Sequence, residues 1–251
     1  MIRHVLLCAA GLGLASLLGS AIGAVVRKIP HRWNDIFLGF CAGMMLAAAL
    51  VCLIMPSIEM LPISQSWQSL LGIALGVGLI SVLDYVTPHL HRLSGLDTEH
   101  HPSGGITDKV LLFVLAIALH KFPEGLATGV SFDGGDIANA YTLSVVIALQ
   151  NIPEGMVVVT PLIMVGVGMW RVVIVSLTVA LLEVVGVCVG YWLGDLSTVL
   201  LPGLMGMAGG AMLYVICDEI MPETQSHGYE KQATYAIVAG VMAMLLIEKI
   251  A

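Results

Sequence analysis

The stretch IALHKFPEG at residues 117–125 is repeated almost unchanged as IALQNIPEG at residues 147–155. The two copies share six of nine residues at a constant offset of 30, including the final Pro-Glu-Gly. Each copy lies within an apolar run long enough to cross a bilayer as a helix, which requires about 20 residues. Because consecutive spanning helices run in opposite directions, the motif recurs on antiparallel helices. Inverted-repeat transporters have this pattern, with broken helices that meet near mid-membrane.

Apolar runs continue on both sides of the repeat and occupy most of the 251 residues. Only 11% of the residues are charged, whereas a soluble protein carries about 25%, so the composition excludes a soluble enzyme and a disordered chain. We predict an all-α fold: a polytopic membrane protein with an eight-helix transmembrane bundle, in which prolines break helices four and five. The whole chain, 1–251, is expected to form one integral membrane domain. The predicted spans are residues 5–26, 35–58, 67–87, 109–131, 136–161, 168–194, 198–221 and 232–250.

The basic residues predict how the bundle lies in the lipid bilayer. Seven of the ten Lys and Arg residues fall in alternate connections, whereas the other connections and both tails hold only Arg3 and Lys249. Cytoplasmic connections are enriched in Lys and Arg, so we expect both termini outside a cell (inner) membrane. The connection 88–108, which contains His89 and His91, is then a cytoplasmic loop.

Net charge and cysteine content indicate which binding partners and which cysteine chemistry to expect. The net charge of −7 argues against nucleic acid, because phosphate contacts need clustered Lys and Arg. The five cysteines lie in or beside apolar stretches without a CxxC pair, so we expect five buried thiols.

Four ionisable side chains interrupt the apolar helices: Glu124, Glu154, Glu183 and Lys121. A carboxylate near mid-membrane costs about 2.5–3.5 kcal/mol on an insertion scale, so these groups must face the bundle interior and have partners. A purely structural cluster is one interpretation, but a single ammonium cannot balance three carboxylates. The missing positive charge indicates a bound cation.

Spacing indicates which side chains hold that cation. His120 and Glu124 are four residues apart and share one helix face. Gln150 and Glu154 repeat this arrangement on the next helix. The two facing pairs bring together an imidazole, two carboxylates and an amide oxygen, which suit Zn²⁺ and similar transition metals. A proline before each glutamate frees a backbone carbonyl, which is tolerated at membrane depth where it lines a cavity.

Other side chains give weaker signals. The Met45 thioether could serve a soft metal, although the presence of 14 methionines favours packing. Glu59, on the predicted outer side, could attract cations. A further group near the cytoplasmic side is explained either by solvated helix ends or by an exit path: Asp84, His89, His91, Asp218 and Glu219.

Two other functions would use similar ligands. An intramembrane zinc-dependent hydrolase also gathers His and carboxylates on apolar helices, but it needs two or three His ligands and an open water position. Only His120 lies in a predicted helix core, and no HExxH motif is present. A metal channel or exporter with the same ligands stays an alternative, because the direction of flux distinguishes it.

HKFPEG at residues 120–125 and QNIPEG at residues 150–155 resemble the metal-binding motifs of the ZIP family of Zrt/Irt-like proteins, most of all its bacterial zinc-uptake branch. Glu183 is similar in position to that family's sixth-helix carboxylate, and DEIMPE at 218–223 resembles its seventh-helix ending. The resemblance implies an eight-helix divalent-metal transporter, not an enzyme, that is often a homodimer. It also implies alternating access that moves Zn²⁺ into the cytoplasm, with helices one, four, five and six moving like an elevator against the rest.

The resemblance also implies a ligand set, which is His120, Glu124, Gln150 and Glu154 with Met45 close by. Gln150 stands where many members have His, so the preference for Zn²⁺ over Cd²⁺, Fe²⁺ and Mn²⁺ stays open.

The family's second metal site would use positions 121, 124, 151, 154 and 183. Lys121 departs from the Asn or Asp that is common in two-metal members, while Asn151 keeps a neutral amide. Because an ammonium repels a second dication, we expect one bound metal, with Lys121 paired to Glu183 or Glu154.

Overall fold

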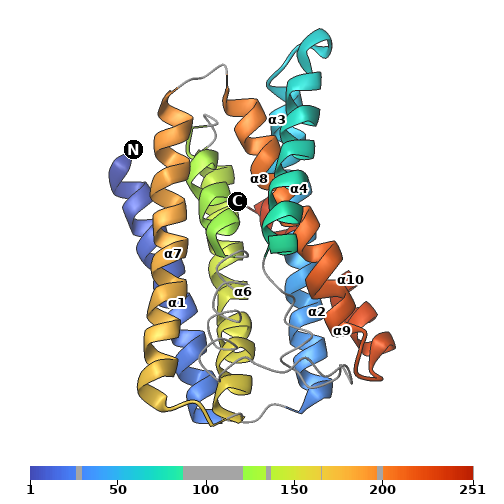
Figure 1. Cartoon of the computed structure of the whole chain (residues 1–251). Coiled ribbons are helices and arrows are strands. Elements are labelled where there is room, and N and C mark those ends of the chain that lie inside the picture. The colour runs from blue at the N-terminus through green and yellow to red at the C-terminus, as the bar shows by residue number, and fades with distance from the viewer. Residues whose placement is uncertain (27–29, 87–120, 134–136, 165, 197–199, 251) are drawn as a thin grey trace.

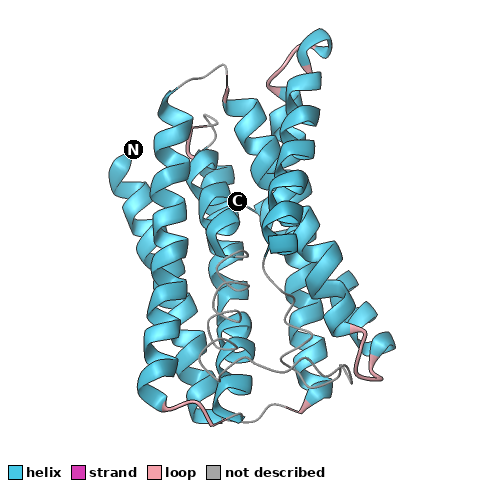
Figure 2. Ribbon diagram, viewed as in Figure 1, coloured by secondary structure: helices cyan, strands magenta, loops and turns pink. Residues whose placement is uncertain are grey.

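The computed structural model describes residues 1–26, 30–86, 121–133, 137–164, 166–196 and 200–250. Within these ranges all regular structure is helical (Figure 2), which confirms the all-α prediction. Seven helical stretches are long and apolar enough to cross a membrane. The eighth predicted span is described only from residue 121, and residues 121–131 are helical. The predicted cytoplasmic loop 88–108 lies outside the described residues.

Most of the predicted spans correspond to single helices: α1 (Ile2–Val26), α4 (Trp67–Val86), α6 (Ile137–Met164), α7 (Met169–Leu196) and α10 (Glu230–Ile250). Two spans are composite. The first is α2 (His31–Ala48), the π-helix η1 (Ala49–Ile54) and α3 (Met55–Glu59). The second is α8 (Leu201–Val215), the π-helix η4 (Ile216–Ile220) and α9 (Met221–Thr224). A short 3-10 helix, η2 (Ile63–Gln65), lies between α3 and α4.

Both composite spans change helical register immediately before a Met-Pro pair, Met55-Pro56 in one and Met221-Pro222 in the other. Proline has no backbone N–H and cannot continue the ladder of helical hydrogen bonds. At the end of η1 the Met55 N–H bonds the Leu50 carbonyl, five residues back, which is the wider π pattern. The sequence predicts proline breaks in helices four and five instead. The structure has α6 as one α-helix from Ile137 to Met164, through Pro153, and the helix that contains Pro123 is described only from residue 121.

The helices gather into two groups, which Figure 1 shows side by side. The first group contains α1, α6 and α7, and the helical segment 121–131 packs against α7 within it. The second group contains α2, α3, α4, α8 and α10, in which α10 packs along α2 and α4 along α8. Between the groups, α2 packs against α6. The second copy of the repeat, on α6, therefore lies on a helix that contacts both groups.

Glycines at the ends of the two repeated motifs allow close helix packing inside the first group. A Cβ atom added at Gly155 of α6 would lie 2.7 Å from the Ser16 carbonyl oxygen of α1. A Cβ atom added at Gly125 would meet the Glu183 carbonyl oxygen of α7. Small residues let membrane helices approach in this way, so the repeat sets helix spacing as well as carrying polar side chains.

The cysteines correct one expectation. Cys8, Cys41 and Cys52 are buried, but Cys188 and Cys217 are exposed. The prediction of five buried thiols is therefore wrong for two of them. An apolar helix has similar side chains toward lipid and toward its neighbours, so composition alone does not indicate which face is covered.

Candidate functional site

A buried polar cluster lies in the first helix group, where segment 121–131, α6 and α7 meet. Lys121, Glu124, Glu154 and Glu183 are 3%, 1%, 9% and 0% exposed, respectively. Their burial agrees with the expectation that charged groups in apolar helices face the bundle interior. Asn151, in the second copy of the repeat, is also fully buried among them. The polar positions that interrupt the apolar runs are thus brought together at one place.

Lys121 lies at the centre of this cluster and uses all three ammonium protons. Its Nζ atom donates to Glu124 Oε2 at 2.7 Å and to Asn151 Oδ1 at 2.5 Å. It also donates to Glu154 Oε2. The expected pairing with Glu154 is therefore present in the structure, and the alternative partner Glu183 is held differently.

Asn151 connects the ammonium to the third carboxylate. Its Nδ2 atom donates to Glu183 Oε1 at 2.6 Å and to the Leu12 carbonyl of α1 at 3.3 Å. Ser16 Oγ of α1 donates to the other oxygen, Glu183 Oε2, at 2.7 Å. Sequence reasoning missed Ser16, because a hydroxyl in an apolar helix has no spacing that links it to a residue 167 positions away. The network joins α1, α6, α7 and segment 121–131 through buried hydrogen bonds.

Three side chains of the cluster keep buried polar atoms without a hydrogen-bond partner among the described residues. These atoms are Glu124 Oε1, Glu154 Oε1, and both Oε1 and Nε2 of Gln150. An unsatisfied buried polar atom costs about 1–3 kcal/mol, so native proteins rarely keep several of them together. Two carboxylate oxygens and an amide oxygen are suited to a divalent cation.

The remaining predicted ligands are placed only in part. Met45 of α2 is 1% exposed and packs in the main apolar core. His120 lies outside the described residues. Across the described ranges, no three His, Cys, Asp or Glu side chains are arranged to hold a metal ion. In the part of the site that is described, an ammonium therefore lies between Glu124 and Glu154.

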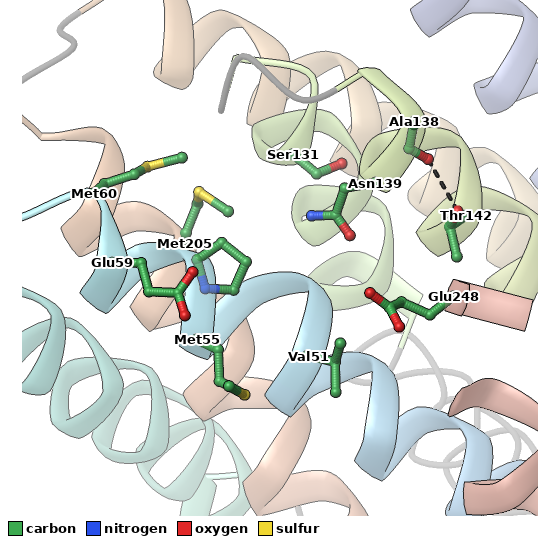
Figure 3. Close-up of a pocket in the computed structure, with 11 residues that line it drawn as sticks. Val51, Met55, Glu59, Met60, Ser131, Ala138, Asn139, Thr142, Met205 and Glu248 are labelled. Atoms are coloured by element: carbon green, nitrogen blue, oxygen red, sulfur yellow. Dashed lines mark hydrogen bonds between the residues drawn. The ribbon is translucent and has the colours of Figure 1, made fainter. Parts of the chain in front are cut away.

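Glu59 of α3 lines a separate cavity of about 390 Å³, to which η1, α6, α8 and α10 also contribute side chains (Figure 3). Glu248 of α10 and Asn139 of α6 line other sides of the same cavity. Asn139 Nδ2 donates to the Cys52 carbonyl of η1 at 3.0 Å. Sequence reasoning missed Glu248, because a charged residue in the last turn of an apolar span is expected to lie in solvent.

The predicted cytoplasmic group is described only in part. Asp218 lies on η4 and is exposed, while the side chains of Asp84 and Glu219, and the whole of His89 and His91, lie outside the description. A contact that the sequence did not indicate joins this end of the bundle: His227 Nδ1 lies 3.0 Å from Asp35 Oδ1. It links the connection between α9 and α10 to the beginning of α2.

The amino-acid sequence is similar to those of known zinc transporters. A family model described as ZIP Zinc transporter matches residues 87–248. The zinc transporter ZIPB of Bordetella bronchiseptica is 39% identical over 256 aligned residues, covering 94% of this chain and 79% of that protein. The zinc transporter GufA of Myxococcus xanthus is 33% identical over 244 residues, covering 94% of each chain. The zinc transporter ZupT of Streptococcus mutans is 26% identical over 249 residues, covering 92% and 91%. The family match includes both repeated motifs and Glu183.

Proposed function

The chain belongs to the ZIP zinc transporter family, and from this premise we propose that it carries Zn²⁺ across a membrane into the cytoplasm. Members of this family are transporters, so the protein is not an enzyme, and the alternative of an intramembrane zinc-dependent hydrolase is set aside. The observation that carries the proposal is the set of unpartnered buried oxygens on Glu124, Gln150 and Glu154. We propose Zn²⁺ as the main substrate, with Cd²⁺, Fe²⁺ and Mn²⁺ as competing ions.

In this proposal the metal is held by His120, Glu124, Gln150 and Glu154, with Met45 beside it. The spacing of the two repeated motifs supports this set, as do the two glutamates that share one ammonium. Charge balance supports a single metal. Three buried carboxylates, one ammonium and one dication sum to zero, whereas a second dication would leave two uncompensated positive charges in a low-dielectric site.

The proposed transport step is alternating access between the two helix groups. Of the proposed ligands that the structure describes, all except Met45 lie on helical segment 121–131 or on α6, in the first group together with α1 and α7. His120 immediately precedes segment 121–131 in the sequence. The second group would then be the body against which the first one slides. Buried hydrogen bonds and glycine contacts within the first group favour its motion as a unit.

Further proposals concern the path of the metal ion through the protein and the placement of the protein in the membrane. Glu59 attracts cations at the outer cavity, and the cytoplasmic release path uses Asp84, His89, His91, Asp218 and Glu219. The chain forms one multi-pass domain of the cell (inner) membrane with both termini outside, and it functions as a homodimer. A dication that moves inward across 100 mV gains roughly 4.6 kcal/mol, twice the value for a single charge, so the membrane potential can drive uptake.

The test is uptake of Zn²⁺ into proteoliposomes that contain the full chain. Glu154→Ala is expected to abolish saturable uptake, because it removes one metal ligand and one partner of Lys121. Glu230→Ala is the matched control, since Glu230 is exposed at the beginning of α10. Unchanged uptake by Glu154→Ala would contradict the proposed site. Comparing uptake with efflux from zinc-loaded vesicles tests the alternative of a channel or exporter.

A further inference from the structure

We propose that Cys41 supplies a sulfur ligand to the metal at this site and so biases the protein toward thiophilic cations such as Cd²⁺ and Zn²⁺. This inference rests on the proposed function, and it adds a ligand that the repeated motifs do not contain. It concerns a residue of α2, in the second helix group, that meets the site from across the interface between the groups.

The position of Cys41 is the first observation. Its side chain is buried, with 1% exposure, and its Sγ lies 3.8 Å from the backbone carbonyl of Gln150 on α6. Gln150 is the first residue of the QNIPEG motif, so the thiol lies against the backbone of the second repeated motif.

The helical register is the second observation. Cys41 and Met45 are four residues apart on α2, so they share one helix face. Gln150 and Glu154 are spaced in the same way on α6, and α2 packs against α6. Two sulfur atoms therefore stand on the helix opposite an amide and a carboxylate. The amide of Gln150 and one oxygen of Glu154 are among the buried atoms that lack hydrogen-bond partners in the described residues.

The other buried cysteines provide a contrast. Cys8 and Cys52 both belong to the main apolar core, where a small apolar side chain is expected. Cys41 is also buried but is not part of that core, and its thiol donates to the Gln150 backbone carbonyl. A packing role therefore explains Cys8 and Cys52 well and Cys41 poorly.

The chemistry follows from ligand softness. Cysteine binds metal as the thiolate, and the displaced proton leaves to water as the metal enters. Thiolate favours Cd²⁺ and Zn²⁺, whereas a site made only of carboxylate and amide oxygens is better suited to harder ions such as Mn²⁺. In the present conformation Lys121 bonds both Glu124 and Glu154. The ammonium bonds the Oε2 atoms of these two glutamates, so the incoming dication can bind between Cys41, Gln150 and the unpartnered Oε1 atom of Glu154.

The experiment titrates Cd²⁺ into the purified full chain and records the ultraviolet charge-transfer band of a cadmium–thiolate bond, which a thioether does not produce. All proteins carry Cys188→Ser and Cys217→Ser, because these two thiols are exposed. The band is expected in this parent and in the matched control Cys52→Ser. It should be lost in Cys41→Ser, in Cys41→Ala and in Glu154→Ala. In proteoliposomes, Cys41→Ser should lower the preference for Cd²⁺ over Mn²⁺ by about tenfold, the lower end of the loss seen when a metal site loses a supporting group.

The outcomes separate the two proposals. A band that persists in Cys41→Ser or in Glu154→Ala shows that cadmium binds another thiol or another place, and it overturns the inference. A parent without the band whose Zn²⁺ uptake still depends on Glu154 also overturns it, while the proposed function survives. Uptake that does not depend on Glu154 contradicts the proposed function itself. Two different Cys41 variants ensure that a folding defect in one does not decide the result.

Discussion

Replacing Lys121 by asparagine tests whether an ammonium occupies the place of a second metal. The Lys121 side chain makes three hydrogen bonds, to Glu124, Asn151 and Glu154, and is 3% exposed. Without it, two buried carboxylates lose their positive partner. Removing one member of a buried ion pair typically costs about 3–5 kcal/mol. We therefore expect Lys121→Asn to lower the free energy of unfolding of the metal-free protein by about this amount.

The same substitution changes the metal balance. With Lys121 present, one dication neutralises the three carboxylates of the cluster. Without it, one dication leaves a net charge of −1 and two leave +1, so the second ion is no longer repelled by a fixed ammonium. We expect the number of bound Zn²⁺ ions per chain to rise from one to two, and zinc to restore most of the lost stability.

Elemental analysis after dialysis measures the metal number, and thermal unfolding with and without Zn²⁺ measures stability. Lys249→Asn is the control, because this residue is exposed at the end of α10. If Lys121→Asn binds no more zinc than the parent, or if its metal-free form is as stable as the parent, the account of Lys121 is wrong.

Three further predictions follow from individual contacts. Asn151→Leu removes the amide that bridges the Lys121 ammonium and the Glu183 carboxylate. Because each buried group left unpaired costs about 1–3 kcal/mol, the free energy of unfolding measured in a denaturation assay should fall by about 2–4 kcal/mol. Gly155→Ala places a Cβ atom 2.7 Å from a carbonyl oxygen of α1, and this overpacking should lower the free energy of unfolding by about 1–3 kcal/mol. Gly11→Ala is the control, because its Cβ atom meets nothing within 4 Å, and it should leave the melting temperature unchanged or raised. Glu248→Gln removes a carboxylate from the cavity that Glu59 also lines, and should slow zinc uptake a few-fold at low ionic strength. The difference should shrink in high salt, and the number of bound metal ions should stay unchanged.

The sequence predicts the spans well because about 20 consecutive apolar residues are a strong signal that does not depend on neighbours. The buried charges Lys121, Glu124, Glu154 and Glu183 are equally clear, because a charged residue in an apolar helix is costly unless it faces the interior. Charge also predicts that Lys121 pairs with a buried carboxylate, although the sequence leaves Glu154 and Glu183 as alternative partners. All of these features can be read from single helices and their repeats.

Other features depend on how helices meet, and the sequence does not predict them. The hydrogen bond from Ser16 to Glu183 depends on the rotation of α1 against α7, which an evenly apolar helix leaves undetermined. The same uncertainty accounts for the exposure of Cys188 and for the position of Cys41 beside Gln150. In a membrane, lipid and core have similar polarity, so hydropathy identifies a span without identifying its inner face.

The location of zinc tests the central claim most directly. Crystals of the full chain grown with Zn²⁺, measured at the zinc absorption edge, would show each bound ion as an anomalous peak. We predict one peak in the buried cluster, about 2.0–2.2 Å from carboxylate oxygens of Glu124 and Glu154, with the amide of Gln150 beside it and Lys121 turned away from the metal. Two peaks in this cluster, or zinc only at other places in the protein, would contradict the account.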